Sequence, residues 1–314
     1  MAAMLVLATA GCDPGQRIAP GAGAATEPVQ AVALLSQHLR DNDLQAFARD
    51  AVPPPLRAPL AAAWQAGRTR WPLDELPFDQ KIPGIVATLS ADKADVQLRR
   101  SFDRQFANAN TEIRAAASAL GLFGVKFLQG DDTLSAEERA HYAQLVSAMS
   151  EWGVRATLGD PKRGRGAIAR LTLAARQTGL RDEADFPRFG MDESLRRLTP
   201  LIAALKETLR SYDLDLDQSL DTMTLSLESR EGDRARVRMR YRLAGKAIDT
   251  VVAVERIDGH WYLSDFLRHA RAAAALAPME TPDAAQKTAP VTAEPLIAPP
   301  GVPPKSATKQ PPSS

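Results

Sequence analysis

The stretch that most constrains the fold is residues 222–266, where the spacing of apolar residues changes from helical to strictly alternating. Alternating runs are typical of strands, and here they cover residues 222–230, 234–243, 246–257 and 260–266. The dipeptides between the runs, which supply the positive φ of a tight hairpin, are Glu231-Gly232, Ala244-Gly245 and Asp258-Gly259. This stretch therefore predicts a small antiparallel sheet connected as a meander.

The second run alternates two kinds of side chain. Its apolar residues, which fall on one face of a strand, are Ala235, Val237, Met239, Tyr241 and Leu243. Its arginines, which fall on the other face and are called the arginine strip below, are Arg234, Arg236, Arg238, Arg240 and Arg242. The carboxylates expected beside them, Glu228, Asp249 and Glu255, are too few to neutralise all five. We predict that the strip binds an acidic protein partner; the alternative is a solvated face with cross-strand ion pairs.

Before the sheet, over residues 29–212, the apolar spacing is helical. We therefore predict an α+β protein in which a predominantly helical domain, residues 29–190, precedes a helix plus the antiparallel sheet, residues 191–276. The helix that Asp192 caps and that ends near Tyr212 is expected to lie across the inner face of the sheet, and is either kinked at Pro200 or restarted there. Residues 277–314 are rich in Pro and Ala and lack apolar periodicity, which predicts a disordered tail.

Three shorter patterns add local expectations. Ser135 followed by Glu138 forms a capping box and predicts the start of a helix. The nearly all-apolar run at residues 120–128 predicts the centre of the helical core, where its two glycines allow a close approach of two backbones. Residues 159–166 are interpreted as a solvated basic loop before a helix that contains Ile168, with an anion site as the alternative.

Cys12 follows a short apolar run and the small residues Ala10 and Gly11. This arrangement resembles the lipobox of bacterial lipoproteins, in which the segment before the cysteine is cleaved and the cysteine is acylated. The resemblance implies that residues 1–11 are a signal peptide and that Cys12 holds the lipid. Residues 1–4 include no basic residue, which a truncated start would explain, and the alternative is an ordinary N-terminus with a chance cysteine.

Acylation of Cys12 would make the lipid bilayer a partner of the chain and place the protein on the periplasmic face of a membrane. Asp13, directly after the cysteine, is the residue that retains such lipoproteins in the inner membrane of many enteric-type bacteria, so the resemblance favours that membrane. Residues 12–28 form a segment rich in Gly, Ala and Pro, which we interpret as a flexible tether with a reach on the order of 20 Å.

Composition and motifs argue against several kinds of site. Lys plus Arg exceeds Asp plus Glu by one, 39 against 38, so no global field favours nucleic acid, and the single cysteine excludes an intrachain disulfide. The run that begins at Asp213 starts like a calcium loop but has Gln218 and Thr224 where glycine and glutamate are needed. Glu138 and His141 lack the second pair of a di-iron site, and His141 is interpreted as a surface histidine. We expect no metal, no cofactor and no catalytic residue.

Residues 258–265, Asp-Gly-His-Trp-Tyr-Leu-Ser-Asp, close the predicted sheet. Together with the preceding helix and meander they resemble the cone-shaped, cystatin-like fold of nuclear-transport-factor-like and ketosteroid-isomerase-like proteins, over residues 192–270. The resemblance implies either an isomerase, which needs a carboxylate base in the cone, or a non-catalytic binding module. The residues expected on the inner face are apolar, mainly Leu225, Leu227, Val237, Met239, Val252 and Val254. None of them can accept a proton.

The sequence therefore favours a membrane-anchored periplasmic lipoprotein that acts as a non-catalytic interaction or scaffold protein. One alternative is an immunity or inhibitor lipoprotein that neutralises a periplasm-acting toxin. A further alternative is a periplasmic enzyme on a cone-like fold, which a carboxylate buried in a wet cavity would favour.

Overall fold

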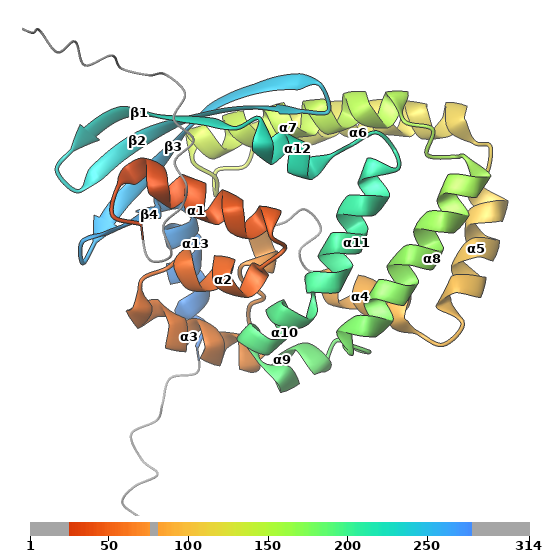
Figure 1. The fold of residues 1–314 in the computed structure, drawn as a ribbon, viewed down its shortest axis with the longest axis horizontal. Helices are drawn as coiled ribbons and strands as arrows, with labels where there is room; N and C mark the ends of the chain where they lie inside the picture. The colour runs from red at the N-terminus through yellow and green to blue at the C-terminus, as the bar shows by residue number, and fades with distance from the viewer. Residues whose placement is uncertain (1–24, 76–80, 278–314) are drawn as a thin grey trace, which may run out of the picture. The chain divides into compact units, whose positions relative to one another are not determined.

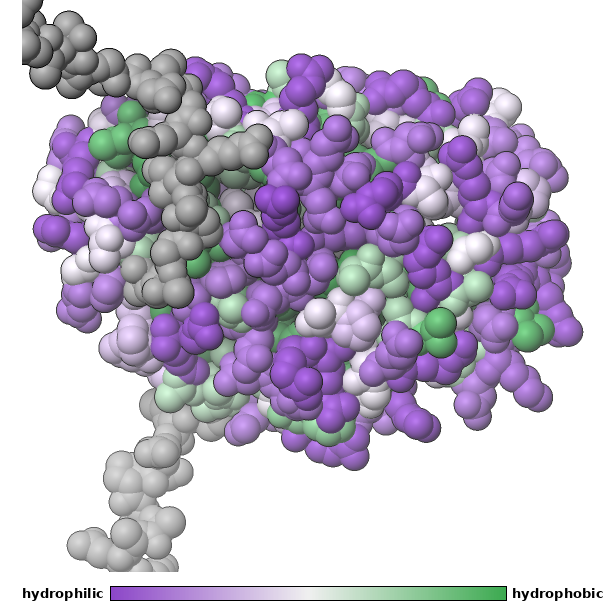
Figure 2. Space-filling view, viewed as in Figure 1, coloured by the Kyte–Doolittle hydropathy of each residue, from purple (hydrophilic) through white to green (hydrophobic). Residues whose placement is uncertain are grey.

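The computed structural model describes residues 25–75 and 81–277, and shows helices packed with one antiparallel sheet (Figure 1). The predicted α+β class, with helices first and the sheet near the end, is confirmed. The expectations for Cys12, the signal peptide and residues 278–314 lie outside the described residues. The surface that Figure 2 shows is mainly hydrophilic, with apolar side chains in small groups.

The sheet has the order β1-β2-β3-β4, and each neighbouring pair is antiparallel. Its strands are β1 (Thr224–Glu231), β2 (Arg234–Leu243), β3 (Lys246–Ile257) and β4 (His260–Leu263). Two hairpins have paired positive φ angles, 52° and 84° at Ala244 and Gly245, and 49° and 82° at Asp258 and Gly259. The predicted meander is confirmed, but its first run begins at Thr224 and turns at Gly232-Asp233 rather than Glu231-Gly232, and its last run ends at Leu263.

Residues 264–266, predicted to be strand, instead begin helix α13 (Ser264–Ala274). The reason is the apolar spacing that follows, because Leu267, Ala270 and Ala274 are buried together on one helical face. The end of the predicted strand is therefore the first turn of a helix.

The inner face of the sheet is covered by α1 (Pro28–Arg40), which contacts β1, β2, β3 and β4. Ala31 and Val32 of this helix share a core with Val237, Val254 and Trp261. The small side chain of Ala31 and the branched Val32 leave little space above the sheet, and all of these residues are buried. The helix that lies across the sheet is thus the first of the described chain.

The expectation that the helix ending near Tyr212 lies across the sheet is wrong. That segment forms α10 (Met191–Arg197) and α11 (Thr199–Arg210), so the helix restarts at Thr199 with Pro200 in its first turn. Only its C-terminal end approaches the sheet, where Leu209 packs near Leu243. α11 packs mainly on α8 (Pro161–Thr178) instead, where Arg170 Nη1 donates to Thr208 Oγ1 at 3.3 Å.

A second core is formed mainly by α2 (Leu44–Asp50), α3 (Pro54–Gln65), η1 (Leu73–Glu75), α4 (Ile82–Ser90) and α9 (Asp185–Phe189), together with α10 and α13. The remaining helices are α5 (Ala94–Gln105), which packs on α8, and α12 (Leu216–Asp221), which packs on β2. The second core joins residues on both sides of the expected boundary at residue 190, because Trp64 and Phe186 share it with Leu195 and Leu267. The segments expected as a helical domain and a sheet domain lie within one compact unit.

Helices α6 (Asn110–Gln129) and α7 (Ala136–Arg155) lie side by side as an antiparallel pair (Figure 1). The predicted capping box opens α7: Glu138 N–H donates to Ser135 Oγ at 3.1 Å, and Ser135 N–H donates to Glu138 Oε2 at 2.7 Å. The predicted close approach is also confirmed. A Cβ added at Gly121 would overlap the side chain of Ser150, and one at Gly124 would lie 3.0 Å from Val146 Cγ1.

The expectation that residues 120–128 form the centre of the core is wrong. The exposed fractions of Leu120, Leu122, Phe123 and Phe127 are 71, 74, 71 and 73%. Only the glycine-bearing side of α6 packs on α7, and its opposite side faces away from the described chain. The apolar composition of a helix indicates that its surface favours burial. It does not indicate that the burying residues belong to the same chain.

The basic segment at residues 159–166 is mainly helical, so the loop interpretation is wrong. Asp160 caps α8 by accepting a hydrogen bond from Arg163 N–H at 2.8 Å, and Pro161 takes the first helical position. The basic side chains therefore project from the first turns of the helix. Gly164 faces α5, where an added Cβ would overlap the ring of Phe102.

Candidate functional site

The arginine strip lies where the alternation of β2 predicts it. The apolar residues Ala235, Val237, Met239 and Leu243 are buried, and Tyr241 is half-buried. Four of the arginines are exposed, while Arg238 in the middle is partly covered. The strip runs along the outer face of the sheet, opposite the face that α1 covers.

A bulge in β1 places one carboxylate between two arginines of the strip. The register between β1 and β2 shifts between Leu227 and Ser229, so that Glu228 has no residue directly opposite it. Its two carboxylate oxygens accept from Arg236 Nε at 3.2 Å and from Arg238 Nη2 at 2.8 Å. These hydrogen bonds, with that from Arg238 the stronger, lower the pKa of Glu228.

Two further carboxylates complete the middle of the strip. Asp249 lies between Arg238, at 3.2 Å, and Arg240, at 3.0 Å. Glu137 in the first turn of α7 reaches Arg236 at 3.0 Å. The hydrogen bond from Arg236 lowers the pKa of Glu137, and the hydrogen bond from Arg240 lowers that of Asp249.

The sequence anticipated part of this charge pattern. Glu228, Asp249 and Glu255 all lie beside the strip as expected, but Glu255, opposite Arg234, forms its ion pair with Arg271 of α13 at 2.7 Å. Glu137 was not anticipated, because a helix residue 99 positions away from Arg236 gives no local signal of its contact with a strand. The middle of the strip is therefore a network of ion pairs between the sheet and α7.

The two ends of the strip differ from its middle. Neither Arg234 nor Arg242 forms an ion pair with any residue that the structure describes, and Arg242 donates instead to the main-chain oxygen of Gly245 at 2.6 Å. Arg234 lines a shallow hollow of about 260 Å³ together with Glu231, Glu255 and other residues. The outer guanidiniums are thus the part of the strip that is available to an external anion.

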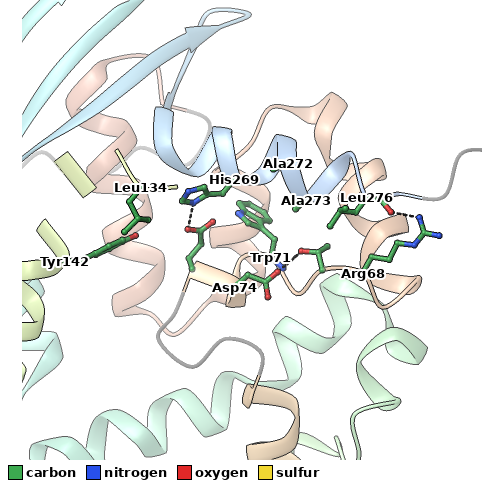
Figure 3. Close-up of a pocket in the computed structure, with 11 residues that line it drawn as sticks. Arg68, Trp71, Asp74, Leu134, Tyr142, His269, Ala272, Ala273 and Leu276 are labelled. Atoms are coloured by element: carbon green, nitrogen blue, oxygen red, sulfur yellow. Dashed lines mark hydrogen bonds and ion pairs between the residues drawn. The ribbon is translucent and has the colours of Figure 1, made fainter. Parts of the chain in front are cut away.

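A second candidate site is a pocket of about 480 Å³ between residues 68–75, α7 and α13 (Figure 3). In it, His269 points toward a carboxylate: its Nδ1 lies 2.7 Å from Glu75 Oε2. Its Nε2 lies 3.6 Å from Glu138 Oε1. Trp71 and Tyr142 line the same pocket.

Several titratable side chains lie close together in this pocket. The hydrogen bond that His269 donates to the Glu75 carboxylate raises the pKa of His269, and burial raises the pKa of Tyr142. Glu138 is buried, pairs with Arg268 and also closes the capping box of α7. A carboxylate that holds an imidazole is an arrangement used in general acid–base chemistry, and it also suits the binding of a small polar molecule.

The sequence did not point to this pocket. Glu75 and His269 are 194 residues apart, and neither belongs to a recognisable motif. His141, interpreted as a surface histidine, is instead half-buried with Nε2 2.8 Å from Tyr241 Oη, and burial lowers its pKa to about 4. Both histidines are placed by packing between α7 and distant segments, which local spacing does not encode.

Within residues 25–75 and 81–277, no group of three or more His, Cys, Asp or Glu residues is arranged to hold a metal ion. In the same ranges, none of the helices has the length and apolar character needed to cross a bilayer. No protein family, curated protein or solved structure matches this chain.

Proposed function

We propose that this protein is a periplasmic lipoprotein, anchored through Cys12, that acts as a non-catalytic interaction protein and binds an acidic protein partner on the outer face of its sheet. The lipobox-like sequence before Cys12 supports the anchor. The arginine strip supports the binding face.

The observation on which the binding function rests is the difference between the middle and the ends of the strip. Ion pairs with Glu137, Glu228 and Asp249 hold the three middle guanidiniums in fixed orientations. Arg234 and Arg242 lie at the two ends, about 27 Å apart at the usual rise of a strand. An extended acidic segment laid along β2 would pair with both ends and lose little of the ion pairing already present.

The binding face is tested by replacing the two end arginines together, Arg234→Gln with Arg242→Gln. A matched control, Arg104→Gln with Arg181→Gln, removes the same charge from exposed arginines that lie off the strip and form no ion pair in the described chain. Each protein is immobilised and exposed to its own envelope extract at low and at high ionic strength. We expect the strip variant to lose a salt-sensitive partner that the wild type and the control both retain.

The middle arginines are less suitable for this test. Replacing Arg236 and Arg238 would leave Glu228 without a partner and add negative charge to the surface under study. The end variant avoids this, and its circular dichroism should match that of the wild type. If the folded end variant captures the same proteins as the control at both ionic strengths, the arginine strip is a solvated face and the proposed binding function fails.

The anchor is tested separately by metabolic labelling with a fatty-acid analogue. Label should appear in the wild-type protein and disappear in Cys12→Ser, which should also leave the membrane fraction. Equal labelling and equal membrane association of both proteins would refute the proposed localisation without affecting the arginine strip.

A periplasmic enzyme is the second candidate function, because the Glu75–His269 pair lines an open pocket. If this pair acts as a general base, His269→Asn should abolish turnover in a screen of ester and amide probe substrates, whereas Arg234→Gln should leave it unchanged. Absence of turnover by the wild type across the screen would leave the interaction protein as the favoured function.

A further inference from the structure

We propose that two copies of this chain associate through the outer side of α6, packed antiparallel about a two-fold axis at Ala119. This interface is independent of the arginine strip and of the pocket at His269. It would bury the largest exposed apolar side chains of the described molecule.

The outer side of α6 lacks a partner in the described part of the chain. Leu120, Leu122, Phe123 and Phe127 are each more than 70% exposed. They belong to one helix and follow one another within eight residues. Monomeric proteins seldom expose contiguous apolar patches beyond a few hundred Å², and larger ones mark interaction surfaces.

The spacing of residues defines the centre of this outer side. Gly121, Gly124 and Ala117 face α7. Cβ atoms added at the two glycines would meet side chains of α7, and Ala117 Cβ lies beside Gly153 of that helix. The residues on the opposite side, which recur at alternating steps of three and four and are all exposed, are Glu112, Ala115, Ala119, Leu122 and Lys126. Ala116, Phe123 and Phe127 flank them. Alternating steps of three and four are the spacing with which two helices pack along a seam.

This sequence is complementary to itself when it is reversed about Ala119. In an antiparallel pair, each residue before Ala119 meets the residue equally far after it in the other copy. Glu112 then meets Lys126, seven positions to either side, and both ends of the interface gain a pair of opposite charges. Neither residue forms an ion pair within the described chain, so both are available.

The apolar residues between these charges are matched in size. Four positions from the axis, Ala115 meets Phe123, and three positions from it, Ala116 meets Leu122. At the axis Ala119 meets its own copy, and this small residue lets the two backbones approach. A parallel pairing would instead place Glu112 beside Glu112 and Lys126 beside Lys126, so charge selects the antiparallel orientation.

The interface has the size that a stable dimer needs. Large apolar side chains expose roughly 150–250 Å² each when free, so the four at about 70% exposure offer on the order of 600 Å² per copy. Two copies would bury about 1,200 Å², the lower limit of stable specific interfaces. A two-fold axis also makes the contact self-limiting, because each copy uses the same surface.

The first test is cross-linking at the axis. In a Cys12→Ser background, Ala119→Cys should form a disulfide-linked dimer under mild oxidation, because the two Cα atoms face each other there. Gly166→Cys is the matched control, since it is also an exposed helical position and an added Cβ there meets nothing within 4 Å. Equal rates of cross-linking for the two cysteines would overturn the proposal.

The second test uses sedimentation equilibrium of the full chain with charge variants. Lys126→Glu and Glu112→Lys should each raise the dimer dissociation constant about tenfold or more, because each brings like charges together twice. The combined variant should restore dimerisation, which no loss of folding would do. A wild-type monomer at all concentrations, or a combined variant as weak as either single one, overturns the proposal. The proposal is also overturned if the wild type stays monomeric and binds phosphatidylglycerol vesicles through Phe123, because the exposed side of α6 would then be a lipid-binding surface.

Discussion

At the scale of single residues, the buried and half-buried charges of this protein join segments that are far apart in the chain. Lys206 of α11 donates from Nζ to the main-chain oxygens of Leu39 and Arg40, at 2.7 and 3.0 Å, and to Asp217 Oδ1 at 2.7 Å. It thereby satisfies the carbonyl groups at the C-terminal end of α1. No sequence pattern reveals such a contact, since a lysine within an amphipathic helix is usually exposed.

Replacing Lys206 with methionine should lower the free energy of unfolding by about 1–3 kcal/mol, because two carbonyls and a carboxylate lose a charged donor. Lys162→Met, at an exposed lysine with no ion pair in the described chain, should change it by less than about 0.5 kcal/mol. Urea unfolding of both variants gives the comparison. Equal effects would show that the Lys206 contacts add nothing to stability.

His269 should make the stability depend on pH. Glu75 raises its folded pKa above the ordinary value of 6.5, so the stabilisation is complete below that value and is lost as the pH rises through the folded pKa. The difference in thermal midpoint between the wild type and Glu75→Gln should therefore be larger near about pH 6 than near about pH 9. Glu183→Gln, at an exposed glutamate, should show no such dependence. A constant difference across the pH range would contradict the assignment.

At the scale of elements, the sequence predicted what is encoded locally and failed where packing decides. Turn dipeptides, strand alternation and the capping box at Ser135 depend on neighbours within a few residues. The alternation, the capping box and the turns at Ala244-Gly245 and Asp258-Gly259 were confirmed, whereas the first turn is Gly232-Asp233, one residue later than predicted. The helix that covers the sheet, the exposed side of α6 and the pocket at His269 depend on contacts between distant segments. The glycines of α6 correctly indicated that another helix lies close to it. They did not indicate that, within the described chain, α6 packs extensively on α7 alone.

Gly121→Ala should destabilise the protein by about 1–3 kcal/mol, because its Cβ would overlap Ser150 and force α6 away from α7. Gly166→Ala provides the opposite control. It also lies within a helix, but an added Cβ there meets nothing, so alanine should stabilise by roughly 0.5–1 kcal/mol. Opposite shifts in thermal midpoint are expected, and shifts of the same sign would show that the close approach has no energetic importance.

At the scale of the whole molecule, the described residues form one unit although the sequence suggests two. Trp64 Nε1 donates to the main-chain oxygen of Phe186 at 2.9 Å, and both residues pack against Leu195 and Leu267 from beyond residue 190. The sequence suggested two domains because the apolar period changes from helical to alternating near residue 222, and the helix before this change was grouped with the sheet. A change of period marks a change of secondary structure, and does not by itself mark the end of a core.

Unfolding should therefore be cooperative across residue 190. Far-UV circular dichroism, which reports mainly the helices, and tryptophan fluorescence, which includes Trp261 of β4, should give the same midpoint in urea. Fragments 25–190 and 191–277, expressed separately, should lack cooperative transitions. Separated midpoints, or a fragment that folds alone, would restore the two-domain description.

The hydrogen bond that joins the chain just before α1 to β4 has a mechanical consequence. Ala25 is buried, and its main-chain oxygen accepts a hydrogen bond from Trp261 N–H at 2.8 Å, immediately before α1 crosses the inner face. Tension applied to the preceding residues would load this bond first and then peel α1 from the sheet from one end, so that contacts break in succession rather than together. The helix that closes the core is thus also the first element that a pull from the N-terminal side would open.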